Sequence, residues 1–211
     1  AILQKRFNCS RHTIRVALRT LYERGLVVSK QGKGTIVQNS PKQPLYQSTF
    51  STLQGLVQYA KTTSRTVLTT NLVELDRDLS HWLSCPQGYK WWKIRTKRQQ
   101  KSDGAIVASS TIYVPGYFEK AVSKLTKSVL PLFSIMQKEY PHEIARVEQT
   151  FSVAYTTEEE ASDLNLKQGA AVMVVERRFI DERGGVIEVA RSAHQPEHFR
   201  YHMTLNQVTN P

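Results

Sequence analysis

Three arginines near the N-terminus have a spacing that suits binding to a polyanion. Arg11, Arg15 and Arg19 repeat every four residues, so on an α-helix they lie along one side. His12 and Thr13 directly follow the first of them. Guanidinium groups bind phosphate oxygens and guanine edges through paired hydrogen bonds, which predicts contact with the phosphates and bases of DNA. The alternative is a charged helix face that is only solvated.

The residues around these arginines define the helix that must position them. Ser10 suits the N-cap, and Gly25 suits the position after the last turn. Two short strands are predicted at 26–28 and 35–37, with a basic turn between them. A helix followed by a basic hairpin is typical of a winged helix-turn-helix, and the hairpin favours DNA binding over a solvated face. Apolar residues at helical spacing predict a buried stripe formed by Ile14, Ala17, Leu18, Leu21 and Tyr22.

Residues 7–37 resemble the signature of the GntR family of bacterial transcription factors. The matching features are an aromatic residue, a turn, Ser-Arg, Thr, a hydrophobic residue, Arg and Ala-Leu, then Gly-Leu-Val and a Gly-x-Gly-Thr wing. The resemblance implies that the helix start approaches phosphates and base edges, and that the wing tip lies in or over the adjacent minor groove. With the rest of the helix face, the candidate DNA-binding residues are Ser10, Arg11, His12, Thr13, Arg15, Arg19, Gln31, Gly32 and Lys33.

Composition and charge also point to the N-terminus as the place of polyanion contact. The chain has 211 residues, 40% hydrophobic and 22% charged, as in an ordinary soluble globular protein. Residues 1–45 hold nine Lys or Arg and one acidic residue, a net +8 of the total +11, which leaves +3 for the remainder. No apolar run approaches the ~20 residues of a membrane span, and no signal peptide opens the chain. We therefore expect a cytoplasmic protein, with Cys9 and Cys85 as free thiols.

Three segments are predicted along the chain. Residues 1–38 form the winged helix-turn-helix, which we expect to lack its first helix. Residues 39–48 contain prolines and no periodicity, as a linker does. Residues 49–211 are predicted to form an α+β domain on a mostly antiparallel sheet. Its helices are expected near 51–59, 76–83, 118–125, 132–140 and before 164, and its strands at 66–75, 89–100, 106–114, 144–155, 171–180, 186–194 and 199–205.

This second segment resembles the UTRA domain of the HutC branch of the GntR family, whose fold is similar to that of chorismate lyase. The matching motifs are Arg98 with a following Asp-Gly turn, Tyr-Val-Pro at 113–115, a helix at 158–166, Glu-Arg at 176–177, and Gly-Val-Ile-Glu at 185–188 leading to Arg-Ser at 191–192. The resemblance implies a domain that binds a small effector and forms a homodimer. It also implies that the whole protein is a transcriptional regulator of double-stranded operator DNA, usually a repressor.

Strand alternation predicts which residues of this domain hold the effector. Side chains alternate between the faces of a strand, so Arg98 and Gln100 share one face, as Ser192 and His194 do on another strand. An inward arginine can clamp an anion, and the helix start near 51–52 offers free amides to it. The alternative is that Arg98 and Glu188 only pair with each other. The candidate effector-binding residues are Ser51, Thr52, Arg98, Gln100, Ser110, Glu188, Ser192 and His194.

The same positions depart from family sites for phosphorylated sugars. Those sites usually have a second arginine where Gln100 stands, an acid at Ser110 and a tyrosine at His194, and a Ser-x-Tyr pair falls here on Pro131 and Phe133. The expected effector is therefore a small anion: a phosphonate, a sugar phosphate or an amino-acid-derived acid. No catalytic, metal or cofactor site is predicted, because the sequence has no nucleophile elbow or metal-ligand cluster. A chorismate-lyase-like enzyme and a non-specific basic nucleic-acid binder remain the alternatives.

Overall fold

The chain forms two compact units, residues 1–43 and 44–211, which are described separately. The computed structural model describes residues 2–23, 27–30, 34–37, 46–47, 53–140 and 144–201. The predicted linker overlaps the second unit, because β3 (Tyr46–Gln47) pairs in parallel with β10 (Phe199–Arg200). A two-residue strand has too few positions to show alternation, so β3 could not be predicted from the sequence pattern. The predicted strand 199–205 is described only as far as β10.

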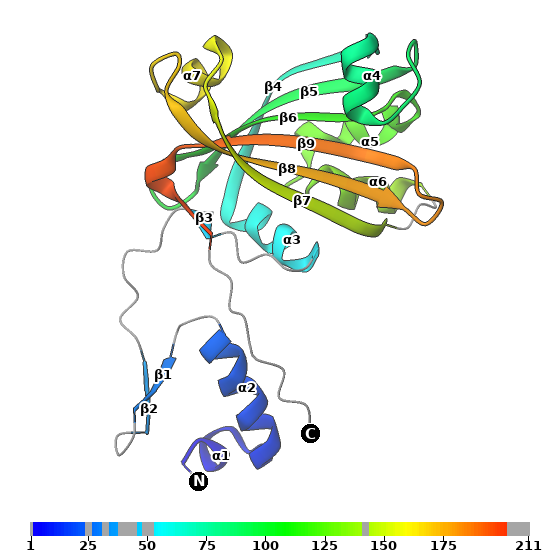
Figure 1. The fold of residues 1–211 in the computed structure, drawn as a ribbon. Helices are drawn as coiled ribbons and strands as arrows, with labels where there is room; N and C mark the ends of the chain where they lie inside the picture. Colours follow the sequence, from blue (N-terminus) through cyan, green and yellow to red (C-terminus); the bar gives the residue numbers. More distant parts are fainter. Residues whose placement is uncertain are drawn as a thin grey trace, which may run out of the picture. The chain divides into compact units, whose positions relative to one another are not determined.

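The N-terminal unit contains a helical pair and a hairpin (Figure 1). Its elements are α1 (Ile2–Phe7), α2 (Arg11–Glu23), β1 (Val27–Lys30) and β2 (Gly34–Val37). The hairpin is antiparallel, with Val27 opposite Val37 and Lys30 opposite Gly34. Gly34 has φ +74°, a left-handed conformation that favours glycine at the end of the turn. The predicted helix and both predicted wing strands are therefore present.

The predicted apolar stripe of α2 is only partly buried. Ile14 and Leu18 are half-buried, whereas Ala17 and Leu21 are exposed. The cause is that α2 packs on α1 and β1, which cover one narrow side of the helix. The side chain of Tyr22 is not among those that the structure describes. Leu3, Phe7 and Val16 are also exposed in this unit.

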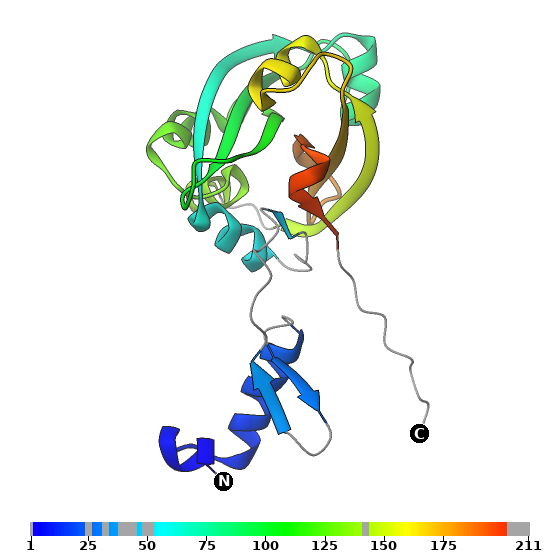
Figure 2. The same ribbon diagram turned by 90° about the vertical axis from the view of Figure 1, so that its left-hand side faces the viewer.

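The C-terminal unit is built on a six-stranded antiparallel sheet with the order β4-β5-β6-β9-β8-β7. Figures 1 and 2 show that the sheet is twisted and curved, with β4 and β7 at opposite edges. The strands confirm the predicted antiparallel α+β arrangement, with bounds β4 (Thr63–Glu74), β5 (Lys90–Gln100), β6 (Ile106–Pro115), β7 (Ile144–Tyr155), β8 (Ala171–Asp181) and β9 (Val186–His194).

Helices cover both faces of this sheet. α3 (Leu53–Thr62), α5 (Glu119–Lys124) and α6 (Leu132–Glu139) share a core with Ile94, Val114 and Phe179. On the other face, α4 (Arg77–Leu83) packs its Leu83 against Trp91, Tyr113 and Val189, and α7 (Glu158–Leu164) packs its Leu164 against Val172, Val174 and Ala193. Short 3-10 turns occupy Gly116–Phe118, Leu125–Lys127 and Pro196–His198, so the helix predicted at 118–125 is shorter than expected.

The caps of α7 and α4 show why these helices begin where they do. Thr157 accepts a hydrogen bond from Glu160 N at 3.2 Å, and the Glu160 carboxylate accepts from Thr157 N at 3.1 Å. These two bonds form a capping box at Thr157, whereas Thr156 donates to Lys167 O. Asp76 caps α4 by accepting from Leu79 N at 2.9 Å. Within the described ranges no helix is both long and apolar enough to cross a membrane.

Candidate functional site

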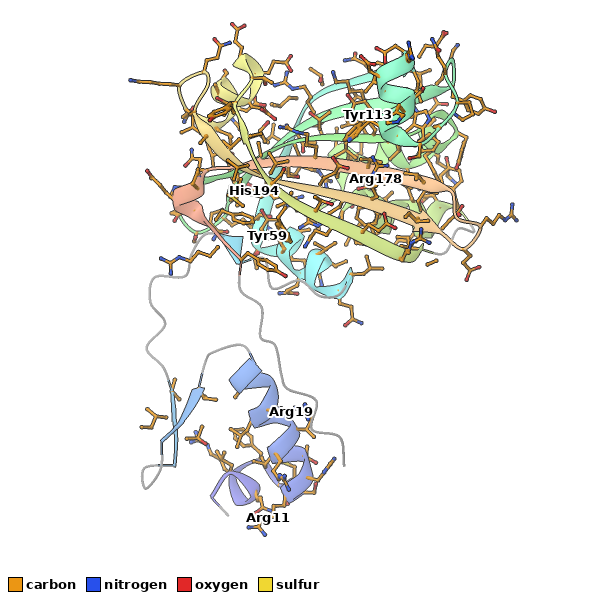
Figure 3. All side chains as sticks on the ribbon, in the orientation of Figure 1. Arg11, Arg19, Tyr59, Tyr113, Arg178 and His194 are labelled. Atoms are coloured by element: carbon orange, nitrogen blue, oxygen red, sulfur yellow. The ribbon has the colours of Figure 1, made fainter. Side chains whose placement is uncertain are left out.

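The basic face of α2 is exposed along its length. Arg11, Arg15 and Arg19 are all exposed, and so are His12 and Thr13. Figure 3 shows Arg11 and Arg19 on this helix. The wing-tip candidates Gln31, Gly32 and Lys33 lie outside the described residues, although the strands that would carry them are in place.

Ser10 and Thr13 fix the start of this helix. The Thr13 N–H donates to Ser10 Oγ at 3.1 Å, and the two side-chain hydroxyls lie 2.8 Å apart. Ser10 is therefore the N-cap that the sequence predicts, and Arg11 is the first residue of α2. The exposed first turn carries basic side chains at a helix N-terminus, and both features favour phosphate binding.

A cavity of about 90 Å³ lies between α3, the start of α6 and one face of the sheet. Thr96, Ser110 and Ser192 lie side by side there, because they are register partners on β5, β6 and β9. The cavity brings together five of the predicted effector residues: Arg98, Ser110, Glu188, Ser192 and His194. Ser51 and Thr52 lie outside the described residues.

Gln100 does not line the cavity, contrary to the alternation argument. The pairing of β5 with β6 shifts register between Arg98 and Gln99, so alternation fails beyond Arg98. The backbone N–H of Gln100 donates to Ala105 O at 2.8 Å and helps to close the hairpin.

Arg98 is held by the junction between α3 and β4. Its Nη1 donates to Thr63 Oγ1 at 2.7 Å, and its guanidinium carbon lies 5.3 Å from the centre of the Tyr59 ring. Arg98 and Tyr59 both line the cavity, and Figure 3 labels Tyr59 together with His194. The charges that lower the pKa of Glu188 against the effect of burial come from Arg65 and Arg177.

Arg65 is a cavity residue that the sequence argument missed. Its guanidinium donates to the carbonyls of Leu125, Ser128 and Leu130 at 2.7–2.9 Å and fastens the segment before α6. Burial, with help from the nearby Arg98 charge, lowers the pKa of Arg65 to about 10, and Glu188 partly opposes this. The strand was predicted to begin at residue 66, so no alternation argument could include this arginine.

Glu188 is the single acidic side chain that lines the cavity among the described residues. It is 4% exposed, and burial raises its pKa to about 8 against the opposing effects of Arg65, Arg177 and a hydrogen bond to the backbone of Phe133. Its Oε2 has no hydrogen-bond partner within the described part of the chain. Arg177, also missed in the sequence analysis of the site, donates from Nε to Gln149 Oε1 at 2.6 Å.

The far end of the cavity is polar but uncharged. Nδ1 of His194 lies 2.9 Å from Val107 O, and since a carbonyl only accepts, this nitrogen carries the proton. Burial lowers the pKa of His194 to about 3, so the ring is neutral near physiological pH. The hydroxyls of Ser110 and Ser192 lie 2.8 Å apart. The cavity therefore combines three arginines, one carboxyl group and neutral hydrogen-bonding groups.

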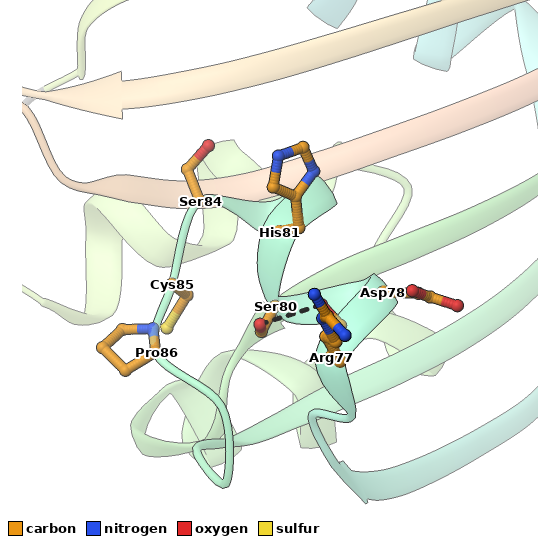
Figure 4. Close-up of a pocket in the computed structure, with 7 residues that line it drawn as sticks. All are labelled: Arg77, Asp78, Ser80, His81, Ser84, Cys85 and Pro86. Carbon is orange, nitrogen blue, oxygen red and sulfur yellow. Dashed lines mark hydrogen bonds between the residues drawn. The ribbon is translucent and has the colours of Figure 1, made fainter.

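A second hollow, along α4 and the residues that follow it, offers no comparable chemistry (Figure 4). It is open to solvent. Its Ser80 hydroxyl donates to Arg77 O at 3.0 Å, and Ser84 is the left-handed C-cap of α4, so both serve the helix itself. Cys85, at its rim, is an unbridged, half-buried thiol, as is Cys9 in the other unit. Among the described residues, no three His, Cys, Asp or Glu side chains are grouped as metal ligands.

Each of the two units matches a known protein family. The profile described as "UTRA domain" matches residues 58–200, and that described as "Bacterial regulatory proteins, gntR family" matches residues 2–37. The HTH-type transcriptional repressor NagR of Bacillus subtilis is 23% identical over 197 residues, covering 93% of this chain and 80% of that protein. The HTH-type transcriptional regulator TreR of the same organism is 26% identical over 203 residues, covering 94% of this chain and 83% of that protein.

Solved structures share the fold. The crystal structure of PhnF from Mycobacterium smegmatis has a TM-score of 0.61 and 20% identity, covering 96% of this chain and 88% of that chain. The ligand-binding domain of a GntR-family regulator from Bordetella bronchiseptica has a TM-score of 0.60 and 18% identity, covering 68% of this chain and 89% of that chain. The findings favour a regulator over the lyase-like enzyme and the non-specific binder. The protein belongs to the UTRA-domain regulators with a GntR-type N-terminal domain, and it is a ligand-responsive, DNA-binding transcriptional regulator.

Proposed function

We propose that this regulator is a cytoplasmic homodimeric repressor of the HutC branch. Its affinity for operator DNA changes when a small anion binds in the cavity of the C-terminal unit. The observation that carries this proposal is the grouping of Arg65, Arg98 and Arg177 around one small buried cavity. Cations are costly to bury without an anionic partner. Three arginines facing one carboxyl group therefore favour a ligand with negative charge.

The exposed basic face of α2 supports the DNA half of the proposal. Arg11 and Arg15 are proposed to reach base edges, and Arg19 to contact phosphates. Ser10, His12 and Thr13 would act at the helix start, and Gln31, Gly32 and Lys33 at the wing tip. A dimer would read a palindrome whose half-sites lie about one helical turn, roughly 34 Å, apart or closer.

Coupling between the two sites requires the anion to prefer one arrangement of the DNA-binding domains. A ligand can shift DNA affinity only by its own difference in affinity for the two arrangements, commonly about 1–3 kcal/mol. The proposed domains are residues 1–38 for DNA and 49–211 for effector and dimer. The segment 39–48 between them is the proposed place where the change is transmitted.

The test begins with DNA that the protein itself selects from a random library. Fluorescence anisotropy would measure binding of this DNA with and without methylphosphonate, glucose 6-phosphate and L-glutamate, each at millimolar concentration. At least one anion should alter DNA affinity by fivefold or more, on the order of 1 kcal/mol. Arg98→Ala should remove the response without weakening DNA binding in the absence of the anion.

Lys97→Ala is the matched control, because Lys97 neighbours Arg98 on β5 but does not line the cavity. It removes the same charge and should keep the response. A response that survives Arg98→Ala unchanged would show that the anion binds elsewhere.

Sedimentation of residues 44–211 at micromolar concentration should give a dimer, and a monomer would contradict the proposed assembly.

A further inference from the structure

Arg65 and Arg98 form a pair of like charges in the wall of the cavity. They are register partners on the neighbouring strands β4 and β5, so their side chains leave the sheet on the same face. Both are half-buried, and both line the cavity. Like charges directly opposite each other in a sheet repel, and burial strengthens the repulsion because less water screens it. Other contacts must therefore hold each arginine in place.

The two arginines are held by different segments of the chain. Arg98 donates to Thr63 Oγ1 at 2.7 Å and lies over the Tyr59 ring, at the end of α3. Arg65 is directed instead to residues 125–131, which we call the strap, and donates to three of its backbone carbonyls at 2.7–2.9 Å. The strap and the end of α3 are thus each attached to one member of a repelling pair.

The strap is joined to the sheet through Arg65. Its own hydrogen bonds are local: Ser128 N–H donates to Leu125 O at 3.4 Å, and Leu130 N–H donates to Ser128 Oγ at 3.1 Å. The three bonds from Arg65 connect this segment to β4. The strap leads into α6, and Phe133 in the first turn of α6 lines the cavity. The hold of Arg65 on the strap therefore helps to set the position of a cavity wall.

The repulsion between the two arginines opposes this hold. While Arg65 bonds the strap, its charge stays beside that of Arg98. When the strap opens, the Arg65 side chain can turn toward solvent, where salt and water screen the repulsion. Burial, and then the charge of Arg98, lower the pKa of Arg65 to about 10, as expected for a cation beside another cation. Removing the positive charge beside Arg65 should therefore favour the closed strap.

We propose that Arg65 couples the strap to the charge of the cavity, so that neutralising the charge at Arg98 tightens the strap. Arg65 is then a positioning residue for this wall. An anion bound beside Arg98 has the same electrostatic effect as neutralisation, so filling the cavity tightens the wall as well. The inference goes beyond the proposed function, because it concerns segments of the C-terminal unit and its test needs neither DNA nor an identified effector.

Hydrogen exchange of the full chain, followed by mass spectrometry of peptides from the strap and from α3, tests the coupling. Arg98→Met should slow exchange in the strap about two- to fivefold, the range expected for one cross-strand charge pair. It should speed exchange at the end of α3, because Thr63 loses its partner. Opposite changes in the two segments distinguish the coupling from a general loss of stability, which would speed exchange in both.

Three further variants serve as controls. Lys97→Met removes an equal charge from the opposite face of β5 and should change neither segment. Arg98→Lys keeps the charge but loses the planar fork, so it should speed exchange at the end of α3 and leave the strap unchanged. In an Arg65→Gln background, which is neutral but can still donate, adding Arg98→Met should no longer slow the strap.

Three results would overturn the inference. The first is a strap whose exchange is unchanged or faster in Arg98→Met. The second is equal slowing by Arg98→Met and Arg98→Lys, because charge would then not be the cause. The third is slowing that persists in the Arg65→Gln background. Thermal melting verifies that each variant is folded, and if the Arg65→Gln background is not, the comparison of Met with Lys at position 98 decides the matter.

Discussion

Thr63 joins Arg98 to the last turn of α3. The Thr63 hydroxyl accepts from Arg98 Nη1 at 2.7 Å and donates to Tyr59 O at 2.9 Å, so one buried side chain orients the arginine and ends the helix. The ring of Tyr59 lies beneath the same guanidinium. The cavity arginine is thus coupled to α3, the first helix of the C-terminal unit after segment 39–48. Such coupling is a physical route by which an anion on Arg98 can act on α3.

Replacing Thr63 by Val should weaken both the fold and the anion site. The change keeps the shape and removes two hydrogen bonds, which should lower the free energy of unfolding by about 1–2 kcal/mol. It should also weaken the response of DNA affinity to the anion, because Arg98 loses its orienting contact. Urea unfolding and fluorescence anisotropy measure the two effects. Thr62→Val is the control, since exposed Thr62 donates to the same Tyr59 carbonyl at 3.0 Å. If both variants weaken the response to the anion equally, the contact between Thr63 and Arg98 does not orient the arginine.

Removing Arg65 should be more damaging to stability than removing any exposed arginine. Its three carbonyl contacts lie in a partly buried region, and Arg65→Ala leaves those carbonyls without their donor. We expect a loss of about 3 kcal/mol in the free energy of unfolding. Arg146→Ala, which removes an exposed arginine paired with Glu148 at 3.0 Å, should cost at most about 0.5 kcal/mol. Equal losses in urea unfolding would show that Arg65 does not fasten the segment before α6.

Glu188 and His194 should give stability a characteristic dependence on pH. The folded-state pKa of Glu188 is raised from 4.5 to about 8, so the folded protein binds the extra proton and stability falls as pH rises between these values. The pKa of His194 is lowered from 6.5 to about 3, so the unfolded chain binds the extra proton and stability falls as pH drops between those values. The two slopes oppose each other between pH 4.5 and 6.5.

Between pH 6.5 and about 8, Glu188 still lowers the free energy of unfolding as pH rises, whereas His194 no longer contributes. Glu188→Gln should therefore flatten the stability curve in that range, while wild type should lose up to ~1.4 kcal/mol per pH unit. Chemical unfolding at several pH values, taken as the difference between variant and wild type, isolates this group from the other titrating residues. A difference that stays constant from pH 6.5 to about 8 would contradict the raised pKa.

The sequence predicted the strands of the C-terminal unit well because their alternation and turns are local properties. Arg98, Ser110 and His194 were placed on one cavity by alternation alone, and the register of β5, β6 and β9 brings their strands together. The prediction that Gln100 lines the cavity was wrong because the register shifts just before this residue, and no local sequence feature marks that shift. Arg65 was missed because its role depends on carbonyls 60 to 65 residues away, which only tertiary packing brings close.

Arg15 offers the sharpest test of the DNA-binding face. It is exposed on the second turn of α2, in line with Arg11 and Arg19. If Arg15 contacts a base, Arg15→Ala should weaken selected DNA by about 1–3 kcal/mol and random DNA far less. If it contacts only phosphate, both DNAs should weaken alike, and the slope of log affinity against log salt should fall by about 0.9. The base-reading role requires the first pattern, measured by fluorescence anisotropy over a range of salt concentrations. Arg146→Ala, an equal loss of charge in the C-terminal unit, should leave both the selectivity and the salt slope unchanged.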